Sequence, residues 1–157
     1  MRHLRALVRA LRGKRWTELG DVAIAQAALL HAKSLLWLRP VGEFLDTGIE
    51  GSPRNGSSVG DVDWETVDRW GRAVTRAASL GVGNPQCLER ALALSKLLER
   101  NGIAGHRVLI GVRWRDGAFI AHAWVELADR IIGDTESNTS TFAKLTGVRV
   151  AQGQGVP

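Results

Sequence analysis

The sequence predicts an α+β domain in which helices come first and a small antiparallel sheet follows. Two observations carry this prediction. Apolar residues recur with the helical period up to about residue 100, and beyond it they alternate with the period of two that is typical of strands. The length of 157 residues is that of about one domain, which is enough for a hydrophobic core without cross-links. We therefore expect one compact domain overall.

The first 46 residues are predicted to form an N-terminal helical region, which is a candidate docking region for a partner. Residues 1–15 hold six basic side chains and no acidic one, and a helix there would have an apolar side made of Leu4, Leu7, Val8 and Leu11. A second helix is predicted from Asp21, as its N-cap, to Leu38, where Arg39-Pro40 would end it. The rest of the chain is nearly neutral, so the net charge of +5 belongs to the basic segment.

Three uses of the basic helix fit this pattern: docking a partner, touching an anionic surface, or packing on the body with its charges in water. Basic-aromatic recognition motifs are missing from the sequence, so we expect no nucleic-acid partner. Val22–Leu38 is apolar-rich, but Gln26, His31 and Lys33 interrupt it, and no secretory signal is visible. We therefore expect no stable membrane insertion. One cysteine excludes an internal disulfide and fits a cytoplasmic location.

The remaining chain divides into a connection and a core. Residues 47–62 are rich in glycine and serine and are predicted to be flexible. Residues 63–157 would form the core of the domain. This core begins with a helix from Asp63 to Leu80, whose apolar side consists of Trp64, Val67, Trp70, Val74 and Ala77.

The best-marked helix lies in "GNPQCLERALALSKLLERNGI", residues 83–103. We expect Asn84 as its N-cap, Pro85 in its first turn and Asn101-Gly102 at its end. Cys87 then sits in the first turn, where unpaired N–H groups and the helix dipole favour the nucleophilic thiolate. The same position also suits a small buried hydrophobe, so the helix alone does not decide the role of the cysteine.

Three strands follow, which the period of two marks at 106–114, 118–127 and 130–135. Arg115-Asp116-Gly117 is predicted to form a hairpin turn between the first two strands. Ala128-Asp129-Arg130 is expected to be a three-residue connection to the third. The tail from Asn138 onward is weakly marked and is expected to fray.

A histidine and an aspartate in these strands give the cysteine a chemical context. Alternation places His122 and Trp124 on the same face of the second strand. A three-residue connection would make Asp134 the diagonal neighbour of His122, at about 7–8 Å between backbone positions, whereas a two-residue turn would direct Asp134 away. Cys87, His122 and Asp134 would then be nucleophile, general base and orienting group, as thiol catalysis requires.

The sequence resembles the transglutaminase-like proteins of lasso-peptide biosynthesis at "CLERALAL", "HAWVEL" and "IIGDT". Cys87 and His122 are 35 positions apart, and Asp134 follows 12 positions later. The resemblance is strong from about Asp63 to Thr135 and looser over the N-terminal helices. It implies a transglutaminase-like or papain-like fold, in which the nucleophile helix packs on the sheet and residues 63–157 are the catalytic core.

This resemblance implies a cysteine protease that removes the leader peptide from a ribosomally made lasso-peptide precursor through a thioester intermediate. Cys87 would attack, His122 would activate it and Asp134 would hold the imidazole. The backbone N–H of Cys87 is the expected oxyanion donor, and the second donor stays open. Gln86, next to the nucleophile, and Trp124, beside His122, are candidate substrate-binding residues, although Trp124 fits a role in the core equally well.

The resemblance also implies partners. The precursor is the substrate, a separate leader-binding protein (a RiPP recognition element) presents it, and an ATP-dependent cyclase of the asparagine-synthetase type closes the macrolactam afterwards. We expect no cofactor and no metal, because the lone cysteine lacks the paired spacing of zinc sites. The alternatives are an acyltransferase acting on a peptide or small amine, a metal site at Cys87, His106, His122 and Asp134, and an inactive scaffold that presents the precursor.

Overall fold

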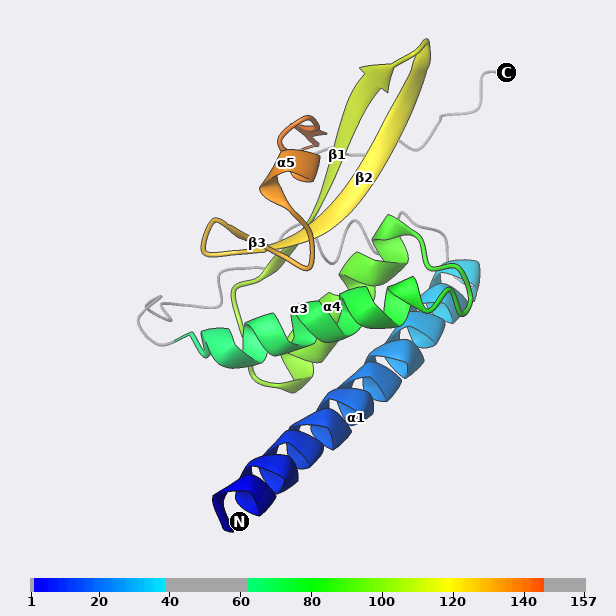
Figure 1. Ribbon diagram of the computed structural model, residues 1–157. Helices are drawn as coiled ribbons and strands as arrows, with labels where there is room; N and C mark the ends of the chain where they lie inside the picture. The colour runs from blue at the N-terminus through cyan, green and yellow to red at the C-terminus, as the bar shows by residue number, and fades with distance from the viewer. Residues whose placement is uncertain (1, 39–61, 146–157) are drawn as a thin grey trace, which may run out of the picture.

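The computed structural model describes residues 2–38 and 62–145, with the side chains of the first helix described from Thr17 onward. Three helices form one layer and a four-stranded antiparallel sheet lies against it, with strand order β3-β2-β1-β4 (Figure 1). The predicted α+β fold is confirmed. The elements are α1 (Arg2–Leu38), α3 (Trp64–Ser79), α4 (Cys87–Arg100), β1 (Arg107–Arg115), β2 (Ala118–Leu127), β3 (Arg130–Ile132), α5 (Glu136–Thr139) and β4 (Ala143–Lys144).

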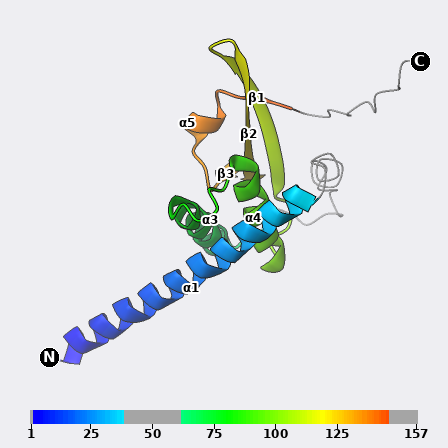
Figure 2. The ribbon, with the colours of Figure 1, turned by 90° about the vertical axis from the view of Figure 1, so that its right-hand side faces the viewer.

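The N-terminal region is one continuous helix, and not the two helices that the sequence predicted. Asp21 lies inside α1, so it is not an N-cap. Asp21 is 6% exposed, and its carboxylate accepts hydrogen bonds from Arg69 of α3, at 2.6 Å from Nε and 2.5 Å from Nη2. The acidic side chain therefore joins two helices instead of starting one. The N-terminal half of α1 projects past the other helices (Figure 2).

Helices α3 and α4 begin and end with local hydrogen bonds that the sequence encodes. Asp63 caps α3, as predicted, by accepting a hydrogen bond from the Thr66 N–H at 3.0 Å. Asn101 ends α4, and Gly102 then adopts a φ of 74°, which a glycine reaches without the steric cost of a Cβ atom. These boundaries agree with the predicted ones for both helices, except at the start of α4.

The core lies where α1, α3, α4 and β2 meet. Each of these four elements contributes one of the largest fully buried side chains: Leu29, Val67, Leu98 and Val125. Burial of one such side chain is worth about 1.5–3 kcal/mol relative to exposure. The helices are therefore held against the sheet by a shared apolar core, which also fixes the start of α4 next to β2.

Both hairpin connections are two-residue turns. β1 pairs with β2 from Arg107–Glu126 to Arg115–Ala118, so the first turn is Asp116-Gly117, with φ values of 51° and 81°. Leu127 pairs with Arg130, so the second turn is Ala128-Asp129, with φ values of 48° and 61°. The three-residue connection predicted from Ala128 to Arg130 was wrong. Positive φ at both central residues is the signature of a type I′ turn, which suits the twist of the strands.

The chain remains ordered for several residues beyond Asn138, contrary to the predicted fraying of the whole tail. Asn138 belongs to α5, and β4 then pairs with β1 at Gly111 and Val112. Several predictions lie outside the described residues: the Arg39-Pro40 stop, nearly all of the 47–62 connection, the chain after 145, and the apolar side of the basic segment.

Candidate active site

Cys87 is the first residue of α4, which begins two residues later than predicted. Gln86 is the N-cap, because Asn84 has a φ of 44°, a left-handed conformation outside the helix. The Gln86 N–H donates to the buried Glu89 carboxylate at 2.8 Å, which closes the first turn. Cys87 is a free, partly buried thiol, and its backbone N–H comes too early in the helix to find an intrahelical acceptor.

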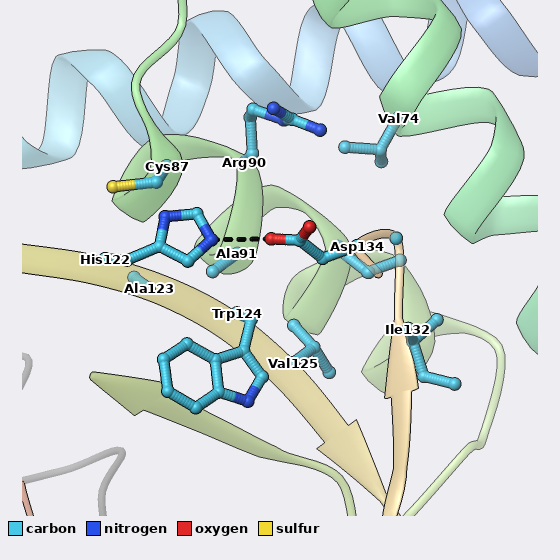
Figure 3. Close-up of a pocket in the computed structure, with 12 residues that line it drawn as sticks. Val74, Cys87, Arg90, Ala91, His122, Ala123, Trp124, Val125, Ile132 and Asp134 are labelled. Carbon is cyan, nitrogen blue, oxygen red and sulfur yellow. Dashed lines mark hydrogen bonds and ion pairs between the residues drawn. The ribbon is translucent and has the colours of Figure 1, made fainter. Parts of the chain in front are cut away.

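His122 lies on β2 with its imidazole between Cys87 and Asp134 (Figure 3). Its Nε2 is 2.5 Å from Asp134 Oδ2, so Nε2–H donates to the carboxylate and Nδ1 is left on the side of Cys87. The ring stacks on Trp124 at 5.9 Å between centroids and is tilted against Phe142 at 5.2 Å. Two aromatic rings and a carboxylate therefore hold the imidazole in one orientation.

Asp134 reaches His122 by a route that the sequence reasoning excluded. With a two-residue turn, regular pairing would place Asp134 opposite Ala123 and direct it away from His122. However, β3 ends at Ile132, and Gly133 adopts a φ of 74°. This left-handed residue redirects the chain, so Asp134 points back to His122. A Cβ atom at Gly133 would also lie 3.1 Å from Leu94 Cδ2.

Asn138 is a site residue that sequence reasoning missed, because it lies in the segment expected to fray. Its Nδ2 donates to Asp134 Oδ1 at 3.1 Å and lies 3.2 Å from His122 Nε2. The Thr135 N–H donates to the same carboxylate oxygen at 2.7 Å. Burial raises the pKa of Asp134, but the hydrogen bonds from His122, Asn138 and Thr135 outweigh it and hold the pKa below its ordinary value. Asp134 is therefore held in its carboxylate form.

A small pocket opens beside these side chains, and apolar residues from α3, α4, β2 and β3 form much of its wall. Its lining residues are Val74, Cys87, Arg90, Ala91, Leu94, His122, Ala123, Trp124, Val125, Ile132, Gly133 and Asp134. Arg90 follows Cys87 by three residues on α4, so both side chains lie on one side of the helix (Figure 3). Within the described residues, no hydrogen bond or ion pair engages the Arg90 guanidinium.

The two predicted substrate-binding residues lie in different surroundings. Gln86 is exposed, its side chain donates to Asn84 O at 3.2 Å, and it does not line the pocket. Trp124 lines the pocket but is only 2% exposed, and its indole N–H has no partner among the described residues. His106, the second histidine of the alternative metal site, does not line the pocket, and its Nδ1 lies 3.0 Å from Ile103 O and its Nε2 3.0 Å from Ser95 Oγ.

Two features are absent from the described residues. They contain no group of three histidine, cysteine, aspartate or glutamate side chains that could hold a metal ion. Among the helices in the described ranges, none is both long enough and apolar enough to cross a membrane.

Comparison with known proteins identifies the family. The model of the transglutaminase-like superfamily matches residues 29–147, which span the end of α1, the other helices and the whole sheet. The chain therefore belongs to the transglutaminase-like superfamily, a group that includes cysteine proteases and acyltransferases. Neither the curated proteins nor the solved structures contained a match.

Proposed function

We propose that this protein is a cysteine protease that cleaves the leader peptide from a lasso-peptide precursor, with Cys87 as nucleophile, His122 as general base and Asp134 as orienting group. One observation carries the catalytic part of this proposal. The His122 imidazole lies between a thiol at a helix start and a carboxylate, with one ring nitrogen toward each. The precursor as substrate rests on the sequence motifs around these three residues.

The first chemical step is attack on the scissile carbonyl. Because Nε2–H is held by Asp134, Nδ1 is free to take the proton of the Cys87 thiol. The thiolate forms a C–S bond, and the carbonyl oxygen becomes an oxyanion. The backbone N–H of Cys87 and the positive end of the α4 dipole stabilise that charge. The C–N bond then breaks as His122 returns the proton to the leaving amine, and the leader remains on Cys87 as a thioester.

The second step releases the leader. A water molecule attacks the thioester carbonyl while His122 accepts a water proton, and the C–S bond breaks. The leader leaves with a new carboxylate, and Cys87 recovers its proton. Hydrolysis requires water at this point, whereas an acyltransferase of the same superfamily would pass the acyl group to an amine. The chemical form of the released leader therefore distinguishes the two activities.

Arg90 adds a cation to this pocket that no described side chain neutralises. A guanidinium presents donors in a fixed fork and therefore suits carbonyl or carboxylate oxygens of a bound peptide. We assign Arg90 to holding the substrate near Cys87. Trp124 stacks on the His122 ring and supports its orientation. Gln86 stays a candidate substrate contact, because its exposed side chain adjoins Cys87 outside the pocket.

We also propose that a separate leader-binding protein delivers the precursor in the cytoplasm, and that an asparagine-synthetase-type cyclase acts on the released core. The pocket is small and offers few polar groups, so the protein alone would bind a long peptide weakly. Delivery by a partner would raise the effective concentration of the precursor. Helix α1 presents large apolar side chains to such a partner, at Ile24, Leu30 and Trp37.

The test is incubation of the precursor with the protein, with and without the leader-binding partner, followed by mass spectrometry of the products. We expect a leader with a free carboxylate and an intact core, formed faster with the partner through a lower KM. The Cys87→Ala protein should give neither product. An amide-linked leader in the presence of amines would instead support the acyltransferase.

A further inference from the structure

One edge of β2 is unpaired over more than half of its length. On one side, β2 pairs with β1 from Ala118 to Glu126. On the other side, β3 covers only the segment from Val125 to Leu127. In the described part of the chain, no strand pairs with the edge formed by residues 118–124 (Figure 1).

The two turns determine which backbone groups this edge presents. In a two-residue hairpin, the residues that flank the turn form a hydrogen-bonded pair, and the pattern alternates along the strand. Ala118 flanks the first turn, so its N–H and C=O point to β1, and those of Phe119 and Ala121 point outward. The second turn gives the same assignment independently, because Leu127 bonds to β3. Both Phe119 and Ala121 are exposed.

The open edge leads directly into the candidate active site. His122 and Ala123, which follow Ala121, line the pocket together with Cys87. A strand rises about 3.4 Å per residue, so Phe119 lies about 10 Å along the edge from His122. Phe119 is 74% exposed there. It makes an edge-to-face contact with Trp114, which is 63% exposed, at 4.5 Å between ring centroids.

Exposed strand edges are normally protected by charged side chains, proline or a bulge. Residues 118–121 carry none of these, because the segment reads Ala-Phe-Ile-Ala and pairs with β1 in regular register. An uncharged, regular edge that ends at a nucleophile is suited to an extended peptide.

We propose that the leader segment of the substrate binds as an added strand along residues 118–121 of β2, with its scissile carbonyl at Cys87. This inference rests on the proposed protease function. Main-chain hydrogen bonds to Phe119 and Ala121 hold the leader, and the Trp114–Phe119 pair contacts an apolar leader side chain about three to four residues from the cleaved bond. The leader is the occupant because it stays bonded to Cys87 after the first chemical step.

The experiment fixes a short peptide at the nucleophile and reads the backbone of β2. The probe is an acetylated peptide of alternating valine and threonine that ends in a glycine chloromethyl ketone. The Cys87 thiolate displaces chloride from it and forms a thioether. Amide hydrogen exchange of the adduct is then compared with that of the unmodified protein, residue by residue. We expect exchange at Phe119 and Ala121 to slow by about tenfold or more, because these N–H groups gain partners.

The Ile120 amide is the internal control, because its N–H already points to β1 and should change little. N-methylation of the probe at the alternate positions that face β2 should abolish the protection, and N-methylation at the intervening positions should preserve it. Phe119→Ser should slow alkylation by the peptide ketone, whereas Leu19→Ser, which removes an exposed apolar side chain from α1, should not. An adduct without protection at Phe119 and Ala121, or with equal protection at Ile120, would overturn the added-strand model.

Failure of the proposed function has a different signature. If neither iodoacetamide nor the peptide ketone alkylates Cys87, the thiol is not an accessible nucleophile and the protease proposal fails. The edge is then tested without chemistry, by adding the same valine-threonine peptide as an amide to the Cys87→Ala protein at millimolar concentration. Protection at Phe119 and Ala121 would support strand addition there, and its absence would overturn it.

Discussion

Replacement of Asp134 by asparagine should inactivate the protein while preserving its fold, and the hydrogen bonds around Asp134 explain why. The carboxylate accepts from His122 on Oδ2 and from Asn138 and Thr135 on Oδ1. An amide has only one oxygen. If that oxygen faces Asn138 and Thr135, it keeps two acceptor contacts, and the amide NH₂ then faces His122.

That orientation imposes the wrong imidazole tautomer. A donor opposite Nε2 requires Nε2 to be unprotonated, so the ring proton moves to Nδ1, which faces Cys87 (Figure 3). His122 can then no longer accept the thiol proton. The corresponding change in a serine protease lowers kcat about 10⁴-fold, and we expect a loss of that order, equivalent to about 5 kcal/mol in activation free energy.

The assay is single-turnover cleavage of the precursor by Asp134→Asn, with thermal unfolding as the measure of folding. Asp68→Asn is the matched control, because it removes the same charge from a carboxylate that pairs with Arg130 at the surface. We expect the control to retain activity. A rate for Asp134→Asn within a few-fold of wild type, in a folded protein, would refute the orienting role of Asp134.

Three further predictions follow from other residues. Gly133→Ala should lower the cleavage rate by more, in free-energy terms, than it lowers the free energy of unfolding. A left-handed alanine costs about 1–2 kcal/mol, and its Cβ atom would press on Leu94 and displace Asp134. Equal cleavage rates for Gly133→Ala and wild type would exclude the role of Gly133 in directing Asp134 to His122. Arg90→Leu should raise KM with a smaller effect on kcat, whereas Arg100→Leu, at the exposed end of the same helix, should change neither. Burial lowers the pKa of His106 in the folded protein. As the pH drops below the ordinary histidine pKa of about 6.5, the unfolded chain therefore binds more protons than the folded one, and the free energy of unfolding should fall. Urea titrations at several pH values measure this fall, which His106→Gln should flatten.

The sequence predicted the parts of the site that depend on local pattern. The helical period and the Asn84-Pro85 start signal placed Cys87 in the first turn of a helix, and the period of two placed His122 and Trp124 on one face. These features depend on side chains a few residues apart, so the amino-acid order specifies them directly.

The position of Asp134 could not be derived in this way. Its direction depends on the conformation of Gly133, and a glycine adopts positive or negative φ with similar ease. The predicted contact with His122 was therefore confirmed for a reason other than the one given, since the expected three-residue loop is a two-residue turn. Likewise, Asn138 escaped notice because a four-residue helix has too few residues to show a period.

The break predicted before Asp21 failed for a related reason. Aspartate favours the N-cap of a helix, but here α3 supplies Arg69 as a partner, and this ion pair, which is buried at its Asp21 end only, lets Asp21 sit inside α1. A partner 48 residues away in sequence overrides the local preference, and sequence pattern does not report it.

The most direct test of the central claim is to trap the intermediate. The protein and its precursor would be mixed, quenched in acid within the first turnover and analysed by intact and peptide mass spectrometry. We predict a transient adduct whose mass equals that of the leader acyl group, located on Cys87 and removed by hydroxylamine, as expected of a thioester. Cleavage that proceeds at the same rate in the folded Cys87→Ala protein would contradict it.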